Sequence, residues 1–391
     1  MRVPAWKPLL AAGTLVLGQA VVATGPAVAV TSPPTITADM PSEVPAGHNW
    51  AFNDFFPRSL RVAQGETIQF VTEGFHTATL LPKGVSPKQD MLTNGVATAD
   101  AEDTTPNPGG QSHTAINIPA LLPTSFTCGT PTSPCTFDGT SVVSSGAPAP
   151  TGPPPGPFAV TITATPGTYQ FHCRIHPGMT GQITVLPAGS RGTSAEDVQE
   201  QVHAQVQADV KGGYAAEQAA SHPKVTRNED GTRTWWLKAG ASGAGGHTAV
   251  LEFLPQKITI KRGDKVAWTS PEPNEPHTVT FPTDIGTDQV PLCEAGSMDT
   301  PFTGLCPGGS PGQPDEVEFA PGNGVNHIKS PATISDSGLL ASHRELAAFG
   351  LPSTAALRSW TVSFHEAAAG AYTYVCQIHG AAMNGTITVS N

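Results

Sequence analysis

The sequence predicts an all-β protein in which two similar domains are joined by a short helix. Segments of alternating apolar and polar residues occur twice in the same order, about 200 residues apart, which indicates an internal repeat. The chain has 391 residues, including 41 Gly and 39 Pro. So many turn-forming residues favour short strands over long helices. Hydrophobic residues make up 38% of the chain, enough to form packed cores.

The first 29 residues have the order of a secretory signal peptide. Arg2 and Lys7 precede an apolar stretch over residues 9–23, and small residues follow at Ala27 to Ala29. The apolar stretch is shorter than the ~20 residues that a membrane-spanning helix needs. We therefore expect a secreted, extracellular protein, cleaved near Ala29, that is not an integral membrane protein.

The clearest repeat begins with two predicted strands. Residues 56–70 reappear as residues 254–268, and each copy alternates apolar and polar residues on both sides of a Gly-acidic turn. A His-Thr pair follows each copy, at His76 and at His277.

The second repeated block lies near the end of each half. Residues 167–173 match residues 370–376, and both segments run through a Tyr to a Cys. A Gly-x-Ile-Thr-Val strand follows in each case. We therefore predict one β domain over 45–187 and a second over 224–391.

The segment 188–223 between these domains has a different composition. Residues 194–220 contain few helix breakers, and Val198, Val202, Val206 and Val210 recur every four residues. Ser194 followed by Asp197 is a typical helix start. We predict a linker helix whose apolar stripe packs on a domain.

Two long loops, roughly 82–157 and 283–355, interrupt the repeats and are rich in Pro, Gly, Ser and Thr. Each loop contains two nearby cysteines, Cys128 with Cys135 and Cys293 with Cys306. In a secreted chain, a close cysteine pair within a loop indicates a disulfide. We expect both pairs to be bonded.

Cys173 and Cys376 are the two cysteines that remain, and they occupy equivalent strand ends. A disulfide between them would connect two domains at positions that should lie inside each one, against the short reach of that bond. Two free thiols in an oxidising compartment need protection, and a bound metal provides it.

The residues near these cysteines form a metal-ligand pattern. His and Met follow Cys173 at the third and sixth positions, and follow Cys376 at the third and seventh. The predicted ligands are His76, Cys173, His176 and Met179 in the first domain, and His277, Cys376, His379 and Met383 in the second. A thiolate, two imidazoles and a thioether are typical of a blue-copper electron-transfer site, whereas zinc rarely recruits Met. We therefore expect two type 1 copper ions per chain.

With these motifs, both halves resemble cupredoxins of the plastocyanin and amicyanin type. The similarity covers about 60 residues of each domain and includes the upstream His, the Gly-x-Tyr run into the Cys, and the closing strand. The first Cys-His-Met loop has the short amicyanin spacing, and Thr77 and Thr278 stand where the family often has Asn. The resemblance implies Greek-key β-sandwiches with copper at one end and a role in one-electron transfer.

Other functions are less consistent with the residues. A copper-buffering protein could use the same ligands, and a copper-free copy would be expected to have lost one. His172 beside Cys173 suggests comparison with nitrite reductases, but the chain has no His-x-His pair for a further copper. We therefore interpret His172 as an outward-facing strand residue and expect an electron carrier rather than an enzyme. His48 and His247 occupy matching positions, for which strand-start packing is favoured over ligation.

The charge of the chain bears on its partners. The formal net charge is −11, so the basic surface that neutralises phosphates is missing and we expect no nucleic-acid partner. Acidic residues in the two long loops could steer a basic redox protein. These residues are Asp100, Glu102, Asp103, Asp315, Glu316 and Glu318.

Overall fold

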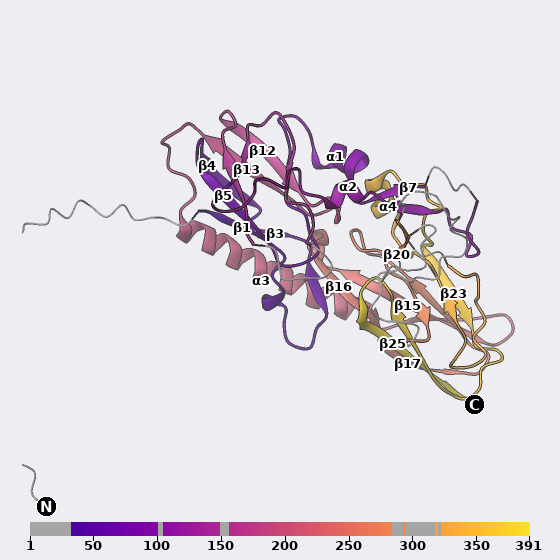
Figure 1. Cartoon of the computed structure of the whole chain (residues 1–391). Coiled ribbons are helices and arrows are strands. Elements are labelled where there is room, and N and C mark those ends of the chain that lie inside the picture. The colour runs from indigo at the N-terminus through magenta and orange to yellow at the C-terminus, as the bar shows by residue number, and fades with distance from the viewer. Residues whose placement is uncertain (1–32, 101–104, 149–155, 284–291, 295–316, 320–321) are drawn as a thin grey trace, which may run out of the picture. The chain divides into compact units, whose positions relative to one another are not determined.

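The computed structural model describes residues 33–100, 105–148, 156–283, 292–294, 317–319 and 322–391 (Figure 1). Within these ranges the chain is mostly β-sheet with few helices, as the composition predicts. The α-helices are α1 (Pro87–Asn94), α2 (Ile118–Leu121), α3 (Ala195–Ala220) and α4 (His343–Phe349), and the 3₁₀ turns are Pro41–Glu43 and Ala244–Gly246. The predicted signal peptide lies outside the described residues.

Two five-stranded sheets form the N-terminal sandwich. The first has the order β3-β1-β5-β11-β9, with β1 (Thr35–Ala38), β3 (Phe55–Phe56), β5 (Thr67–Thr72), β9 (Cys135–Phe137) and β11 (Phe158–Ile162). The second has the order β10-β6-β12-β13-β4, with β4 (Ser59–Ala63), β6 (Thr79–Leu80), β10 (Val143–Ser144), β12 (Gly167–His172) and β13 (Thr180–Leu186). Side chains from both sheets, including Phe70 and Phe171, bury each other in one core.

The C-terminal sandwich also pairs two sheets around one core. The first has the order β2-β16-β15-β18-β23, with β2 (Trp50–Phe52), β15 (Arg233–Ser242), β16 (Thr248–Leu254), β18 (Lys265–Thr269) and β23 (Ser359–Ser363), and β14 (Lys224–Arg227) pairs with β15. The second has the order β17-β25-β24-β19-β22, with β17 (Lys257–Lys261), β19 (Thr280–Phe281), β22 (Ser335–Asp336), β24 (Gly370–Cys376) and β25 (Gly380–Ser390). Trp268 and Tyr374 lie in the shared core.

Equivalent strands pair in the same way in both halves. The strand β4 runs parallel to β13, as β17 runs parallel to β25. The strand that carries each Cys is antiparallel to the strand after it, in the pairs β12–β13 and β24–β25. The pairs β5–β11 and β18–β23 also correspond. The repeated segments therefore occupy matching places in their sheets.

The segment before the first repeated strand takes part in both sandwiches. The strand β1 pairs with β5 although it precedes residue 45, where the sequence places the start of the first domain. The strand β2 instead pairs with β16 of the C-terminal sandwich, with Ala51 opposite Ala249. Phe52 and Phe56 are both buried against Val206 of α3, which holds this segment in place.

The helix expected over 194–220 is present as α3, the long helix in Figure 1. The hydroxyl of Ser194 accepts a hydrogen bond from the backbone N–H of Asp197, as the capping pair predicts. Its valine stripe packs on both halves, because Val206 contacts Phe52 and Phe56 while Val210 also borders the cluster that contains Leu254. That α3 joins two separate domains stays a prediction.

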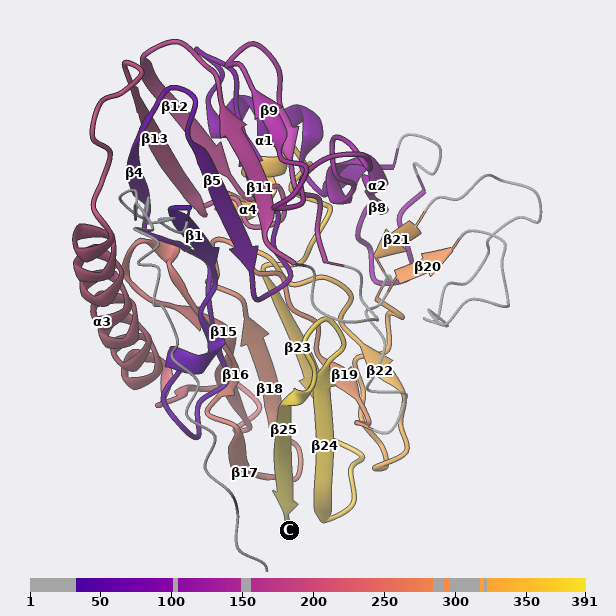
Figure 2. The ribbon, with the colours of Figure 1, turned by 60° about the vertical axis from the view of Figure 1, so that its left-hand side comes forward.

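The two long loops contain further elements and meet in a small sheet (Figure 2). Its order is β20-β21-β8-β7, with β7 (Ala97–Ala99), β8 (Thr114–Ile116), β20 (Leu292–Glu294) and β21 (Val317–Phe319). The Cys128–Cys135 disulfide is present, with Cα atoms 4.9 Å apart. The predicted Cys293–Cys306 disulfide lies outside the described residues because it involves Cys306.

No helix in the described part of the chain combines the length and the apolar character needed to cross a membrane.

Candidate metal centres

His76, Cys173 and His176 converge at one end of the N-terminal sandwich. His76 lies between β5 and β6, Cys173 directly follows β12, and His176 lies in the loop before β13. The Cys173 Sγ atom is 4.0 Å from Nδ1 of His76 and 3.7 Å from Nδ1 of His176. The two Nδ1 atoms are 2.9 Å apart, and all three residues are buried. These atoms form a compact triangle that could hold a metal ion.

The second group, His277, Cys376 and His379, has the same arrangement. The Cys376 Sγ atom is 3.9 Å from Nδ1 of His277 and 3.4 Å from Nδ1 of His379. The two Nδ1 atoms are 3.2 Å apart. This triangle could also hold a metal ion.

Met179 and Met383 are fully buried in the same core clusters as Cys173 and Cys376. In the first loop, the Met179 N–H donates to the His176 carbonyl, and the Cys173 N–H donates to the Met179 carbonyl, each at 3.0 Å. In the second half, Met383 lies within β25, and a register shift separates Val375 from Cys376. The structure thus brings the Cys and both His of each predicted set together and places each Met in the adjoining core.

A threonine forms hydrogen bonds with each cysteine and with the residue that follows it. The backbone N–H of Thr77 donates to the Cys173 sulfur at 3.4 Å, while the Thr77 hydroxyl accepts from the N–H of Arg174 at 2.8 Å. Thr278 makes the corresponding contacts with Cys376 and the N–H of Gln377, at 3.4 and 2.8 Å. The hydroxyl therefore ties the upstream strand segment to the ligand loop in both halves.

The electrostatic setting favours thiolates. Burial opposes ionisation of Cys173, but hydrogen bonds and charge from His176 and His76 outweigh burial and hold its pKa well below the usual range. The pKa of Cys376 is lowered in the same way, by His379 and His277 against burial. Burial by itself would lower the pKa of His379, but Cys376 and Glu275 raise it to about 10. The thiolate that soft metals require is thus stabilised by its partner ligands.

Carboxylates lie near the outer nitrogens of three of the four histidines. The Asp39 Oδ2 atom is 3.8 Å from Nε2 of His76. Glu275 lies near both others, with Oε1 3.1 Å from Nε2 of His176 and Oε2 3.4 Å from Nε2 of His379. No pattern in the sequence singled out either carboxylate. Only the position of Glu275, two residues before His277, could have drawn attention to it.

Around His277 the backbone of Gly240 approaches the imidazole closely. A Cβ atom at Gly240 would lie 2.1 Å from the Nε2 atom of His277. Gly240 also has a φ of +75°, which side-chain-bearing residues rarely adopt. Glycine therefore fits both the backbone conformation and the close approach of this imidazole.

The interpretation of His172 as an outward-facing residue is wrong. His172 is fully buried, and its Nε2 is 2.9 Å from Oδ2 of Asp90 on α1. Arg174 also donates to Asp90 through Nε, at 2.7 Å. The long loop folds back over β12 through α1, so His172 is covered by a partner that lies 82 residues earlier in the chain.

His48 and His247 do not join the cysteine-centred groups. His48 lies close to Glu217 and Glu252, with its Nδ1 atom 2.7 Å from Glu217. The Trp50 indole also donates to Glu217, and the His48 and Trp50 rings are 4.6 Å apart. His48 thus packs beside Trp50 at the start of β2, and its group with Glu217 and Glu252 is also close enough together to hold a metal ion.

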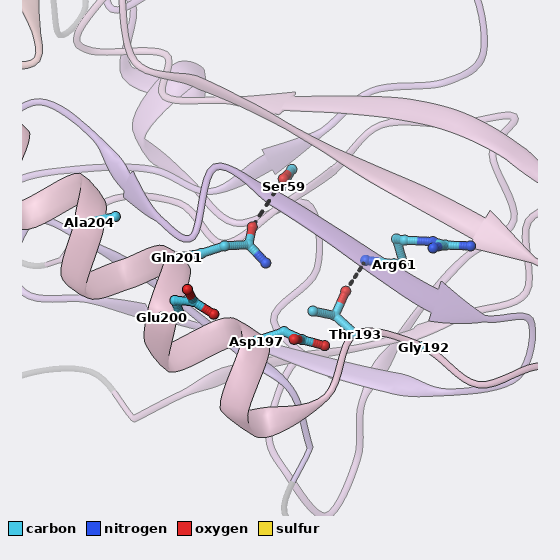
Figure 3. Close-up of a pocket in the computed structure, with 8 residues that line it drawn as sticks. All are labelled: Ser59, Arg61, Gly192, Thr193, Asp197, Glu200, Gln201 and Ala204. Atoms are coloured by element: carbon cyan, nitrogen blue, oxygen red, sulfur yellow. Dashed lines mark hydrogen bonds between the residues drawn. The ribbon is translucent and has the colours of Figure 1, made fainter.

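A surface pocket between β4 and the first turns of α3 is lined by polar side chains (Figure 3). The Ser59 hydroxyl donates to the Gln201 side chain at 3.3 Å, and the Arg61 N–H donates to the Thr193 hydroxyl at 2.8 Å. The pocket includes none of the predicted metal ligands, and its hydrogen bonds fasten α3 to the sheet.

Comparison with solved structures finds plastocyanins and auracyanins. A fern plastocyanin mutant is 18% identical, and the match covers 40% of this chain and 99% of that one, with a TM-score of 0.18. Auracyanin from Roseiflexus castenholzii is 15% identical, and the match covers 36% of this chain and 88% of that one, with a TM-score of 0.19. Auracyanin B is 18% identical, and the match covers 44% of this chain and 100% of that one, with a TM-score of 0.21. These structural neighbours are cupredoxins. No family model and no curated protein matches the chain.

Proposed function

We propose that this chain is a secreted electron-transfer protein made of two tandem cupredoxin domains, each with one type 1 copper centre. The observation that carries the proposal is the presence of two His-Cys-His triangles in equivalent places of two sandwiches, buried except for the half-buried His379. The residue pattern that both halves share with cupredoxins supports the proposal. The Cys128–Cys135 disulfide is consistent with secretion into an oxidising compartment.

The donor set fits copper. His76, Cys173, His176 and Met179 would hold one ion, and His277, Cys376, His379 and Met383 the other. Bound copper would supply a one-electron couple between its two oxidation states. The chain contributes rigidity, because the three-ligand loop lies between two paired strands and the threonine hydroxyl fastens it to the upstream segment. Small rearrangement between oxidation states favours rapid electron transfer.

Two alternatives remain as outcomes of the test. A copper-buffering protein would use the same ligands without redox turnover. An enzyme resembling nitrite reductase would need His172 for a further copper, but Asp90 already engages the Nε2 atom of His172. We therefore favour an electron carrier with an unidentified, basic redox partner.

The absorption spectrum and copper content of the purified mature protein test this proposal. We expect two copper ions per chain, a strong thiolate-to-copper absorption, and reversible bleaching by a one-electron reductant. Cys173→Ser and Cys376→Ser should each remove about half of the colour, because each cysteine serves one centre. Complete loss of colour in one single variant would contradict the two-site proposal. Colour that cannot be bleached would favour buffering.

A further inference from the structure

Glu275 lies between the two ligand groups and contacts both. Its Oε1 atom is 3.1 Å from Nε2 of His176, and its Oε2 atom is 3.4 Å from Nε2 of His379. The side-chain amide of Asn53 also donates to Oε1, at 3.0 Å. Glu275 is buried, so water does not compete freely for these contacts. One carboxylate therefore joins a histidine of the N-terminal sandwich to a histidine of the C-terminal sandwich.

The orientation of the two imidazoles makes this contact relevant to the metal centres. Both histidines direct Nδ1 toward their own cysteine sulfur, at 3.7 Å for His176 and 3.4 Å for His379. A metal held at Nδ1 would leave the proton on Nε2, and this buried N–H then needs a hydrogen-bond acceptor. Glu275 supplies one acceptor oxygen to each ring. The two centres are then connected by imidazole, carboxylate and imidazole through two hydrogen bonds.

Neighbouring contacts hold Glu275 in this place. The side-chain oxygen of Asn274 accepts from the Gly178 N–H at 2.9 Å, within the first ligand loop. The Asn274 amide donates to the Gly246 carbonyl at 2.8 Å, in the C-terminal half. A Cβ atom at Gly178 would lie 2.7 Å from the Asn274 side chain, so the loop and the segment approach closely.

The bridge is not a feature of the repeat. Glu275 precedes His277 by two residues, and the residue two before His76 is Gly74. A Cβ atom at Gly74 would lie 2.7 Å from Nε2 of His76 and 2.8 Å from Oδ2 of Asp39, which leaves no room for a side chain there. The carboxylate is thus specific to the position where the two sandwiches meet.

We propose that Glu275 is the bridge through which one electron passes between the two copper centres of the same chain. This inference rests on the proposed function. In the step, copper(I) at one centre is oxidised to copper(II) while copper(II) at the other is reduced to copper(I). No covalent bond breaks, and both protons stay on their Nε2 atoms.

The test uses the copper-loaded full chain after partial reduction by a short radiolysis pulse. We expect the electron to redistribute between the centres in a first-order phase whose rate does not depend on protein concentration. Glu275→Leu removes both acceptors at similar volume and should slow this phase about tenfold, as expected when a hydrogen-bond partner of metal-ligating histidines is lost. Glu275→Gln keeps one acceptor oxygen and should give an intermediate rate.

Glu252→Gln is the matched control, since it makes the same chemical change at a half-buried glutamate whose hydrogen bond goes to the Asn49 backbone. In the described part of the chain, no hydrogen bond joins Glu252 to either histidine, so the redistribution rate should not change. A second measurement is the NMR spectrum of the diamagnetic copper(I) form. The Nε2 protons of His176 and His379 should both be protected from solvent exchange in the wild-type protein, and both should lose protection in Glu275→Leu.

The outcomes separate the two proposals. A wild-type chain that lacks two blue copper ions contradicts the proposed function and the bridge together. Two blue ions with equal redistribution rates in the wild type, Glu275→Gln and Glu275→Leu contradict the bridge alone. A redistribution rate proportional to protein concentration also contradicts it, because the electron would then move between molecules. If Glu275→Leu does not fold, the comparison of wild type with Glu275→Gln decides.

Discussion

At the residue scale, the Arg58 guanidinium interacts with two acidic side chains rather than with one. Arg58 donates to Asp54 through Nε at 2.7 Å and is 3.2 Å from Asp209. Asp54 and Asp209, the second of them on α3, thus share one guanidinium. Burial of Asp209, together with the neighbouring Asp54, outweighs Arg58 and raises the pKa of Asp209 to about 8.

The raised pKa predicts a pH dependence of stability. In the unfolded chain Asp209 ionises near 3.8, so at pH 7 the folded state holds a proton that the unfolded state has released. The free energy of unfolding should therefore fall as pH rises through the neutral range toward 8. Asp209→Asn should remove this part of the slope, so that the variant gains stability relative to the wild type between pH 6 and 8.

Urea unfolding midpoints at pH 6, 7 and 8 measure the difference. Glu200→Gln is the control, because it makes the same chemical change at an exposed position of the same helix. Parallel pH curves for the wild type and Asp209→Asn would contradict the prediction.

At the scale of elements, α1 supports the first ligand loop from outside the repeat. Its capping box begins at Ser86, and its Asp90 receives hydrogen bonds from Arg174 and lies within 2.9 Å of His172. These two residues flank Cys173 in sequence. Burial opposes ionisation of Asp90, but His172 and Arg174 outweigh it and hold its pKa below the usual range.

Replacing Asp90 should therefore disturb both stability and the metal centre. Asp90→Asn leaves the buried Arg174 without its counter-charge, which should cost about 3 kcal/mol in the free energy of unfolding. Because the network contributes stability above the usual aspartate pKa and is lost in acid, the difference from the wild type should shrink toward low pH. The blue absorption should shift as the residues beside Cys173 move.

Thermal unfolding and the absorption spectrum measure these two effects. Lys88→Gln, an exposed charge change on the same helix, should alter neither. An unchanged unfolding temperature in Asp90→Asn would show that the network is not a support of the loop.

At the scale of the whole molecule, the two ligand groups lie in halves that share elements. The strand β2 of the N-terminal half completes a C-terminal sheet, and β8 pairs with β21 through Ala115 and Glu318. Glu275 adds a contact between the ligand loops themselves. These contacts bring the two predicted copper sites into one connected structure.

As the proposed electron carrier, the chain should lack substantial nitrite reductase or phenol oxidase activity. Each predicted copper has its positions filled by protein ligands, and reduction of nitrite or oxygen needs a metal with an exchangeable position. Steady-state assays of nitrite and oxygen consumption by the copper-loaded protein should stay at the level of free copper controls. Turnover at enzymatic rates that is abolished by His172→Ala would contradict this prediction.

The sequence alone predicted several elements and their local chemistry. Alternating strands, the Gly-acidic turns, the Ser194 cap and the Cys-x-x-His-x-x-Met spacing depend on residues close together in the chain, so their pattern is visible without coordinates. The same holds for the Cys128–Cys135 disulfide, whose partners are seven residues apart. The pairing of His76 with Cys173 needed the repeat as well, because only its recurrence singled out these histidines.

Tertiary structure alone decided the contacts between distant segments. The burial of His172 under Asp90, the entry of β2 into a C-terminal sheet and the placement of Glu275 between His176 and His379 involve partners about 80 to 200 residues apart. A single carboxylate or a three-residue strand carries no periodic signal of its own. Its partner is set by which surfaces the two sandwiches bury against each other, and that depends on the packing of the whole chain.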